Sequence, residues 1–134
     1  MDKVSLKAEM EVVLSQEDID DIMVGALEGG INYWCDEAKV VGDYLGEYAS
    51  QQISRGGQLL LHDFEKDKTC MLDKEKFLNG IRLYISNGNT YCLEILRGNY
   101  GIPTGKDKLD TCRLDAGMAD CIIQYALFGE IVYG

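Results

Sequence analysis

The side chains that could do covalent chemistry are few in this sequence and stand apart from one another. The only histidine, His62, lies in the run LLLHDFE beside Asp63, and the five cysteines include no CxxC pair. A histidine can activate a cysteine as a nucleophile, but such partners meet in space and the spacing here selects no pair. The sequence also lacks GxSxG, a Walker loop, GxGxxG after a strand, HExxH and a metal-spaced Cys/His cluster. We therefore predict a protein without catalytic activity, metal or cofactor.

A cluster of aromatic and polar side chains follows two glycines in the segment EGGINYWCDEA, residues 28–38. Tyr33 and the single tryptophan, Trp34, can stack on a base or another planar ring. Asn32 can form hydrogen bonds with polar atoms of such a ring. The alternative is that Tyr33 and Trp34 fill the seam between the first helix and the sheet.

Arginines are scarce in this acidic chain, and three of them are candidates for holding an anionic ligand. A guanidinium can grip a phosphate or a carboxylate with two parallel hydrogen bonds. The alternative for each arginine is an ion pair with one of the 23 acidic residues. The sequence thus predicts a ligand site formed by Asn32, Tyr33, Trp34, Arg55, Arg82 and Arg113.

The elements that must position these residues are four helices and a small, mainly antiparallel sheet, as indicated by hydrophobic periodicity and capping residues. The first helix begins at Ser15, in the capping-box sequence SQED, and ends at Gly29 and Gly30. The other helices are predicted over 43–55, 74–86 and 115–128. Gly46 weakens the helix predicted over 43–55 by about 1 kcal/mol.

Six strands are predicted, and two of them are joined by a short polar turn into a β-hairpin. The glycine-rich segment 98–108 is predicted as a loop, either a hairpin connection or a cover over a site. The strands are expected at 4–14, 39–42, 58–64, 69–72, 90–96 and 130–134, the hairpin being 58–64 with 69–72.

Length and composition favour a single α+β domain over residues 1–134. The chain is 46% hydrophobic, which is too apolar for disorder. Its first residues, MDKVSLKAEM, are too polar for a secretory signal, and no run reaches the length of a membrane span. Together with unpaired cysteines, this pattern predicts a cytoplasmic protein with reduced thiols.

The formal charge of −10 restricts the partners that this chain can have. A nucleic-acid backbone requires a basic face, and an anionic membrane also repels an acidic protein. An acidic surface suits a basic protein partner instead, including one that normally holds DNA. Most of the carboxylates lie on predicted helix faces, where a solvated surface is the alternative explanation.

Two runs resemble a family of short proteins encoded by phages, prophages and mobile elements of Gram-positive anaerobes. They are LSQEDIDDIMVGALEGGINYWCDEAKVVGDYLGEYASQQISRGG and MADCIIQYALFGEIVYG. The resemblance carries no catalytic residue over to this chain. It implies a setting in which small genes encode accessory functions, and inhibition of host defence is prominent among them.

Two mechanisms fit that setting, and neither is enzymatic. The first, which we predict, is sequestration of a small nucleotide-derived immune signal by a homo-oligomer. The alternative is an acidic, DNA-mimic-like protein that inhibits a nucleic-acid-binding defence nuclease by direct contact. The oligomer is expected because the helix at 115–128 is apolar nearly all round and the terminal EIVYG can add an edge strand to a neighbour.

Overall fold

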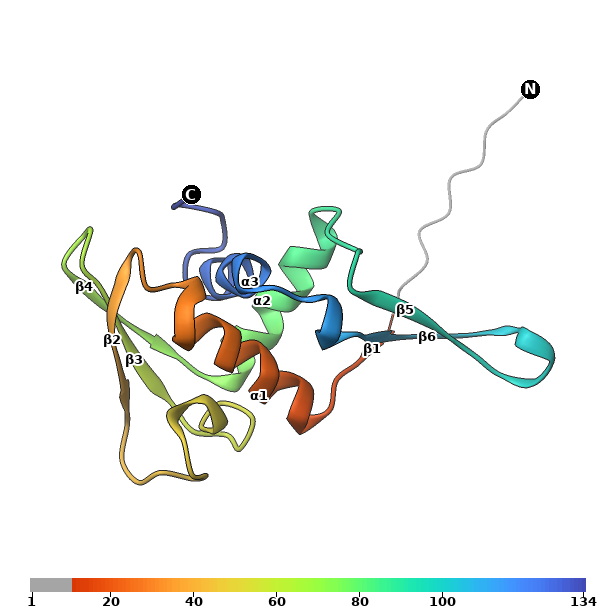
Figure 1. The fold of residues 1–134 in the computed structure, drawn as a ribbon, viewed down its shortest axis with the longest axis horizontal. Helices are drawn as coiled ribbons and strands as arrows, with labels where there is room; N and C mark the ends of the chain where they lie inside the picture. The colour runs from red at the N-terminus through yellow and green to blue at the C-terminus, as the bar shows by residue number, and fades with distance from the viewer. Residues whose placement is uncertain (1–10) are drawn as a thin grey trace.

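Three α-helices occupy the middle of the molecule and a three-stranded sheet lies on either side of them (Figure 1). This computed structural model describes residues 11–134. The two sheets are mostly antiparallel, so the predicted α+β class is confirmed. Residues 11–134 form three α-helices rather than the four predicted, because the helix expected over 43–55 does not form.

Helix α1 (Gln16–Gly25) begins where the capping-box sequence predicts. The side chain of Ser15 accepts from the backbone N–H of Asp18, and the Asp18 carboxylate accepts from the N–H of Ser15. The helix continues into a π-helical turn, Ala26–Gly30, before the chain reverses. Its buried face is formed by Ile19, Ile22 and Met23.

Helices α2 (Lys74–Ser86) and α3 (Ala116–Phe128) confirm the predictions for 74–86 and 115–128. Asp73 and Asp115 cap their first turns by accepting a backbone N–H three residues on. The two helices lie against each other at Gly80, where an added Cβ would come within 2.6 Å of the Ile122 carbonyl oxygen.

One sheet has the strand order β2-β3-β4, formed by β2 (Cys35–Val40), β3 (Leu59–Asp63) and β4 (Lys68–Leu72). The predicted hairpin of 58–64 with 69–72 is confirmed as β3 and β4. The predicted strand at 39–42 forms earlier, as β2. Leu59, Leu61 and Asp63 of the central strand are buried, and the side chains between them face outward.

The other sheet has the order β1-β6-β5, formed by β1 (Glu11–Val13), β6 (Pro103–Leu109) and β5 (Leu93–Arg97). β1 is the end of the strand predicted over 4–14, and the rest of that prediction lies outside the described residues. The predicted strand at 90–96 is confirmed in part as β5.

The loop predicted over 98–108 is confirmed as a hairpin connection at 98–102, and the prediction was wrong for 103–108, which form a strand. A 3₁₀ turn at Asn99–Gly101 leads into β6, which pairs with β5 and extends away from the helices (Figure 1). The strand is nearly all exposed, so its sequence shows none of the alternation by which a half-buried strand is recognised.

The helix predicted over 43–55 does not form, and only a 3₁₀ turn at Ala49–Gln51 is present there. The side chains of Gln51 and Gln52 accept hydrogen bonds from backbone N–H groups of residues 45, 47 and 48. These bonds satisfy the backbone in a non-helical conformation, and Gly46 lowers the cost of leaving the helix.

The predicted edge strand at 130–134 was also wrong, because this tail lies against α3 instead of forming a strand. The all-round apolar character of α3 has an explanation within one chain. Helices α1 and α2, the π-helical turn and the tail cover it from several sides. Burial of this helix therefore needs no second subunit.

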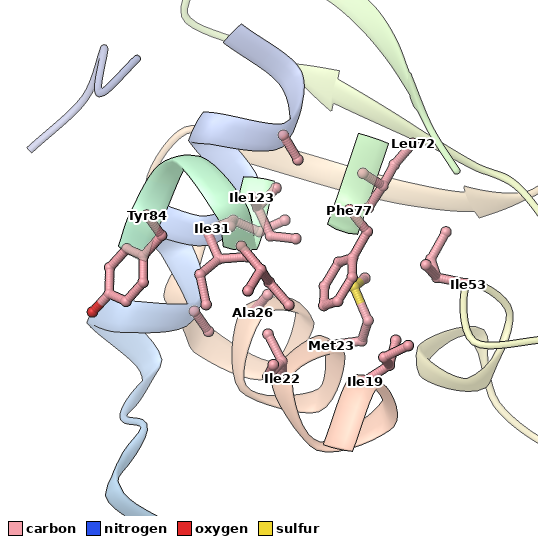
Figure 2. Close-up of a cluster of buried hydrophobic side chains, with 14 of the residues drawn as sticks. Ile19, Ile22, Met23, Ala26, Ile31, Ile53, Leu72, Phe77, Tyr84 and Ile123 are labelled. Atoms are coloured by element: carbon pink, nitrogen blue, oxygen red, sulfur yellow. The ribbon is translucent and has the colours of Figure 1, made fainter. Parts of the chain in front are cut away.

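The core lies where the three helices meet the inner face of β3 and β4. Figure 2 shows Phe77 and Met23 between Leu72 and Ile19, with Ile22 and Ile123 to one side of them. Burial of such side chains stabilises the fold by about 1.5–3 kcal/mol each. Among the described helices, none combines the length and the apolarity needed to cross a bilayer.

Candidate functional site

Trp34 is a core residue and does not line a pocket. Its side chain is 0% exposed, its ring stacks on Tyr133 at a centroid distance of 5.6 Å, and Phe128 lies tilted against it at 5.5 Å. The indole Nε1–H donates to Asp120 Oδ1 at 2.8 Å. This geometry agrees with the seam alternative and leaves no face of the indole open to a ligand.

Tyr33 lies at the edge of the same cluster, with its side chain half exposed and its hydroxyl directed inward. The hydroxyl donates to Asp120 Oδ2 at 2.6 Å, and Gln124 Nε2 donates to Asp120 Oδ1 at 2.9 Å. Burial, followed by the hydrogen bond to the Asp120 carboxylate, raises the pKa of Tyr33 to about 12. Asp120 is therefore held by three donors, which join the segment after α1 to α3.

Gln124 extends this network to the end of the chain. Its Oε1 accepts from the N–H groups of Val132 and Tyr133, both at 2.8 Å. The Tyr133 hydroxyl donates to Asp63 Oδ2 at 2.7 Å, at the end of β3. The aromatic side chains of INYWC thus help to join α3, the C-terminal tail and the sheet β2-β3-β4.

The three predicted arginines lie apart from this cluster. Arg55 forms an ion pair with Asp20 at 3.3 Å, and Arg113 forms one with Asp110 at 3.4 Å. Arg82, on α2, donates to the side chain of Asn79. The ion-pair alternative therefore describes Arg55 and Arg113.

Asn32 is exposed and lines a hollow of about 420 Å³ together with Asp36 and Glu37. Two carboxylates make this hollow unfavourable for a phosphate. Arg82 and Arg113 line other hollows, on α2 and beside β5. Within residues 11–134 of one chain, the six predicted residues do not share a cavity.

His62 lies on the outer face of β3 and contacts carboxylates on both sides. Its Nδ1 is 2.6 Å from Asp36 Oδ1, and its Nε2 is 2.9 Å from Asp67 Oδ1. Both hydrogen bonds raise the pKa of His62, and the bond with Asp36 has the larger effect. Burial raises the pKa of the thiols of Cys35, Cys70, Cys92 and Cys121, so these cysteines keep their protons at neutral pH.

The segment 41–48 carries several exposed apolar side chains together with two carboxylates, and we call it the acidic loop. Tyr44, Leu45 and Tyr48 are 60%, 49% and 60% exposed, and Asp43 and Glu47 alternate with them. Large apolar side chains at the surface, mixed with charged ones, are typical of a protein-binding site. The sequence did not indicate this candidate binding surface, because the spacing of Tyr44, Leu45 and Tyr48 was interpreted as one side of the helix predicted over 43–55.

Two glutamines hold the acidic loop in its shape. Gln52, which is 1% exposed, accepts from the N–H of Leu45 and donates to the carbonyl of Asp43. Gln51 Oε1 accepts from the N–H groups of Glu47 and Tyr48 at 2.7 and 3.2 Å. A loop fixed in this way loses less conformational entropy when a partner binds.

The acidic loop belongs to a strongly acidic stretch of the sequence. Residues 11–57 carry ten carboxylates and two basic side chains, a formal charge of −8 out of −10 for the whole chain. Arg55 connects the loop to α1, because Gly46 lies beside its guanidinium while Asp20 of α1 pairs with it. The uneven distribution of charge is visible in the sequence, where counting by segment finds it.

Comparison of the chain with protein-family models, with curated proteins and with solved structures finds no significant match. The geometry and charge described above therefore supply the basis for the function proposed below.

Proposed function

We propose that this chain is a non-enzymatic inhibitor that binds, through the acidic loop and the neighbouring face of α1, to a basic protein surface that normally holds nucleic acid. The observation that carries the proposal is the acidic loop itself, where exposed aromatic residues alternate with carboxylates on a fixed backbone. In the phage or mobile-element setting implied by the resemblance, the partner would be a defence nuclease in the host cytoplasm.

The charge supports a partner of this class. A surface that binds duplex DNA is lined with lysine and arginine, and a segment with a charge of −8 is complementary to it. Electrostatic complementarity of this kind raises the association rate and selects the partner, while most of the affinity comes from elsewhere.

The exposed aromatic residues supply that affinity. Tyrosine is among the residues that contribute most to binding at protein interfaces, and Tyr44 and Tyr48 stand free of the core. We expect replacement of either by alanine to weaken the complex by about 2 kcal/mol, roughly 30-fold. Neither residue contributes a hydrogen bond from its hydroxyl to the fold of the described chain, so folding is expected to be unaffected.

The geometry favours this function over sequestration of a nucleotide-derived signal. Sequestration requires an aromatic face and an arginine in one pocket, whereas Trp34 is buried and the hollow at Asn32 has the carboxylates of Asp36 and Glu37 in its lining. An oligomer that brings an arginine of a second chain to the exposed ring of Tyr33 would be needed to build such a site.

Affinity capture from the lysate of a host strain tests the proposal. We expect the immobilised protein to retain a basic nucleic-acid-binding protein, and we expect duplex DNA to displace it because both occupy the same surface. The Tyr44→Ala/Tyr48→Ala variant is expected to lose the retained protein, while Tyr91→Ala, an exposed tyrosine outside the loop, keeps it.

Two results would contradict the proposal. One is retention that duplex DNA does not affect, since the bound surface would then not be the nucleic-acid site. The other is a retained protein that the loop variant holds as well as the unmodified chain does. Release of a small molecule on denaturation would support sequestration instead.

A further inference from the structure

The hairpin of β5 and β6, residues 93–109, extends beyond the helices as an arm (Figure 1). Ile95, Tyr100 and Ile102 on this arm are 52%, 101% and 63% exposed. A two-stranded hairpin is marginally stable in water, and within residues 11–134 the strand that pairs with it is the short β1. The arm therefore exposes more apolar surface than the described part of the chain covers.

A groove of about 580 Å³ lies along β5, and we call it the arm groove. Its lining combines three apolar side chains with three charged ones and consists of Leu93, Glu94, Ile95, Leu96, Arg97 and Arg113. Glu94 stands opposite Lys108 across the β5–β6 ladder, and Arg113 pairs with Asp110.

Arg97 is the cation that the arm groove can offer to a partner. Its guanidinium donates to the carbonyl oxygen of Gly101 at 3.0 Å. It forms no ion pair with any acidic residue in the part of the chain from 11 to 134. An exposed guanidinium in a hollow that also has apolar side chains in its lining suits a carboxylate that is accompanied by a large apolar side chain.

The acidic loop has the complementary chemistry. Its residues 43–48, DYLGEY, place a carboxylate on each side of Leu45, and three of its side chains are large, apolar and exposed. Asp43 and Glu47 form no ion pair with the described basic side chains. The arm between residues 95 and 108 has three basic side chains and one acidic one, whereas residues 11–57 have a charge of −8.

We propose that the arm groove of one copy binds the acidic loop of a second copy in a reciprocal dimer. The arm and the acidic loop lie at opposite ends of the long axis of the molecule (Figure 1). Two copies placed side by side in opposite directions therefore bring each arm to the other copy's loop, and both contacts form under one two-fold axis. Arg97 then meets Glu47 of the second copy.

This dimer covers the surface assigned above to a protein partner, so the dimer and the partner complex exclude each other. The inference does not rest on the proposed function, because the dimer is measured on the purified chain alone. If the loop variants lose the partner and the purified chain does not dimerise, only the dimer is disproved. If the chain dimerises but binds no partner, only the proposed function is disproved.

Sedimentation equilibrium of the purified full-length chain, with a charge exchange, tests the dimer. We expect the unmodified chain to dimerise, and Arg97→Glu and Glu47→Arg each to raise the dimer dissociation constant at least about tenfold, as for other close charge pairs between proteins. The double variant carries the same two charges exchanged and is expected to restore dimerisation.

The matched control for Glu47→Arg is Glu65→Arg, which makes the same change of charge on an exposed residue outside the acidic loop and the arm groove. It is expected to leave the dissociation constant unchanged. A chain that stays monomeric up to about 1 mM would overturn a second copy as the occupant. The reciprocal contact would be overturned if Arg97→Glu left the dimer dissociation constant unchanged. It would also be overturned if the double variant failed to restore dimerisation.

Discussion

Asp120 organises the aromatic cluster at the scale of single residues. Its two carboxylate oxygens accept from the side chains of Tyr33, Trp34 and Gln124, and the residue is 6% exposed. All three donors are neutral, so the carboxylate depends on hydrogen bonds alone, and loss of Tyr33 leaves the buried Oδ2 without its donor. This arrangement explains why tyrosine and tryptophan adjoin in the sequence: both side chains reach one carboxylate.

Replacement of Trp34 by alanine tests this structural role. We expect the free energy of unfolding to fall by about 3–5 kcal/mol, because the variant loses a fully buried aromatic side chain. Urea denaturation followed by circular dichroism measures the change. Tyr91→Ala, at a side chain that is 68% exposed, serves as the control and is expected to stay within about 0.5 kcal/mol. A fall of less than about 1 kcal/mol for Trp34→Ala would contradict core packing.

His62 gives the stability of the protein a dependence on pH. Hydrogen bonds to Asp36 and Asp67 raise its folded-state pKa above the ordinary value of 6.5. Its stabilising contribution is therefore fully present below the unfolded-state pKa and is lost as pH rises through the folded-state pKa. We expect the melting temperature of the unmodified chain to exceed that of His62→Gln by more at about pH 5.5 than at about pH 8.

The matched control for this titration is Lys39→Gln, on the same outer face of the sheet. Lysine stays charged throughout this range, so its effect on the melting temperature is expected to be the same at both values. Differential scanning calorimetry of the three proteins measures both gaps. A gap for His62→Gln that grows with pH would contradict the ion pairs with Asp36 and Asp67.

At the scale of elements, the sequence predicts those whose signals are local. Ser15, Asp73 and Asp115 mark three helix starts that the structure confirms, since a capping side chain bonds to the backbone of its own first turn. The segment 43–55 was predicted wrongly because hydrogen bonds from its own side chains replace the helical backbone pattern, and residues 103–108 because they pair with strands from elsewhere in the chain. Two glutamine side chains fix the first, and pairing with β5 and β1 forms the second.

The candidate site was less predictable than the fold for the same reason. Trp34 and Tyr33 were identified as important from their types, but only Asp120, 86 and 87 residues away along the chain, decides that they are structural. The acidic loop carries its signal in the sequence as alternating tyrosines and acids. A helical assignment concealed it, because Tyr44 and Tyr48 are spaced as neighbours on one side of a helix.

Gly80 allows α2 and α3 to lie close together, and its replacement tests that contact. An added Cβ would lie 2.6 Å from the Ile122 carbonyl oxygen and 2.7 Å from the Ala126 Cβ, so Gly80→Ala forces the helices apart. We expect a loss of about 1–3 kcal/mol in the free energy of unfolding, in spite of the higher helix propensity of alanine.

Gly117→Ala is the matched control for this substitution. Gly117 lies in the exposed first turn of α3, where the nearest atom to an added Cβ is the Asp115 carboxylate oxygen at 3.4 Å. The same change there is expected to raise the free energy of unfolding by about 0.4–1 kcal/mol. Urea denaturation of both variants gives the comparison, and a neutral or stabilising Gly80→Ala would disprove the close contact of α2 with α3.

Gln52 holds the acidic loop, and its removal separates the shape of the loop from its composition. Gln52→Ala deletes the hydrogen bonds to the backbone of Leu45 and Asp43 and leaves every exposed side chain in place. We expect faster cleavage by a protease within 41–48, because local opening becomes easier. Limited proteolysis with mass spectrometry locates the cut. An unchanged cleavage rate would show that the glutamine does not fix the loop.

At the scale of the whole molecule, charge is distributed unevenly along the fold. Residues 11–57 have a formal charge of −8, whereas residues 58–90 have five acidic and five basic side chains. Repulsion among the carboxylates of the first segment opposes folding and is screened by salt. A surface that lowers stability in this way is consistent with selection for binding, since a basic partner relieves the same repulsion.

Neutralising part of the acidic surface tests whether this repulsion is present. In the Glu17→Gln/Asp43→Asn/Glu47→Gln variant, three exposed carboxylates of the first segment lose their charge. We expect a gain of about 1 kcal/mol in the free energy of unfolding at low salt, at a few tenths of a kcal/mol for each like-charge contact removed. The gain is expected to shrink as salt is added, because screening already weakens the repulsion in the unmodified chain.

The control for this comparison removes three carboxylates that lie outside residues 11–57, as Glu65→Gln/Glu75→Gln/Glu130→Gln. Two of these acids have lysines as sequence neighbours, so their loss removes attraction as well as repulsion and no gain is expected. Thermal denaturation across a series of sodium chloride concentrations measures both variants. Equal gains for the two would mean that the stability responds to net charge alone. The concentration of charge in residues 11–57 would then not be what limits the stability of the fold.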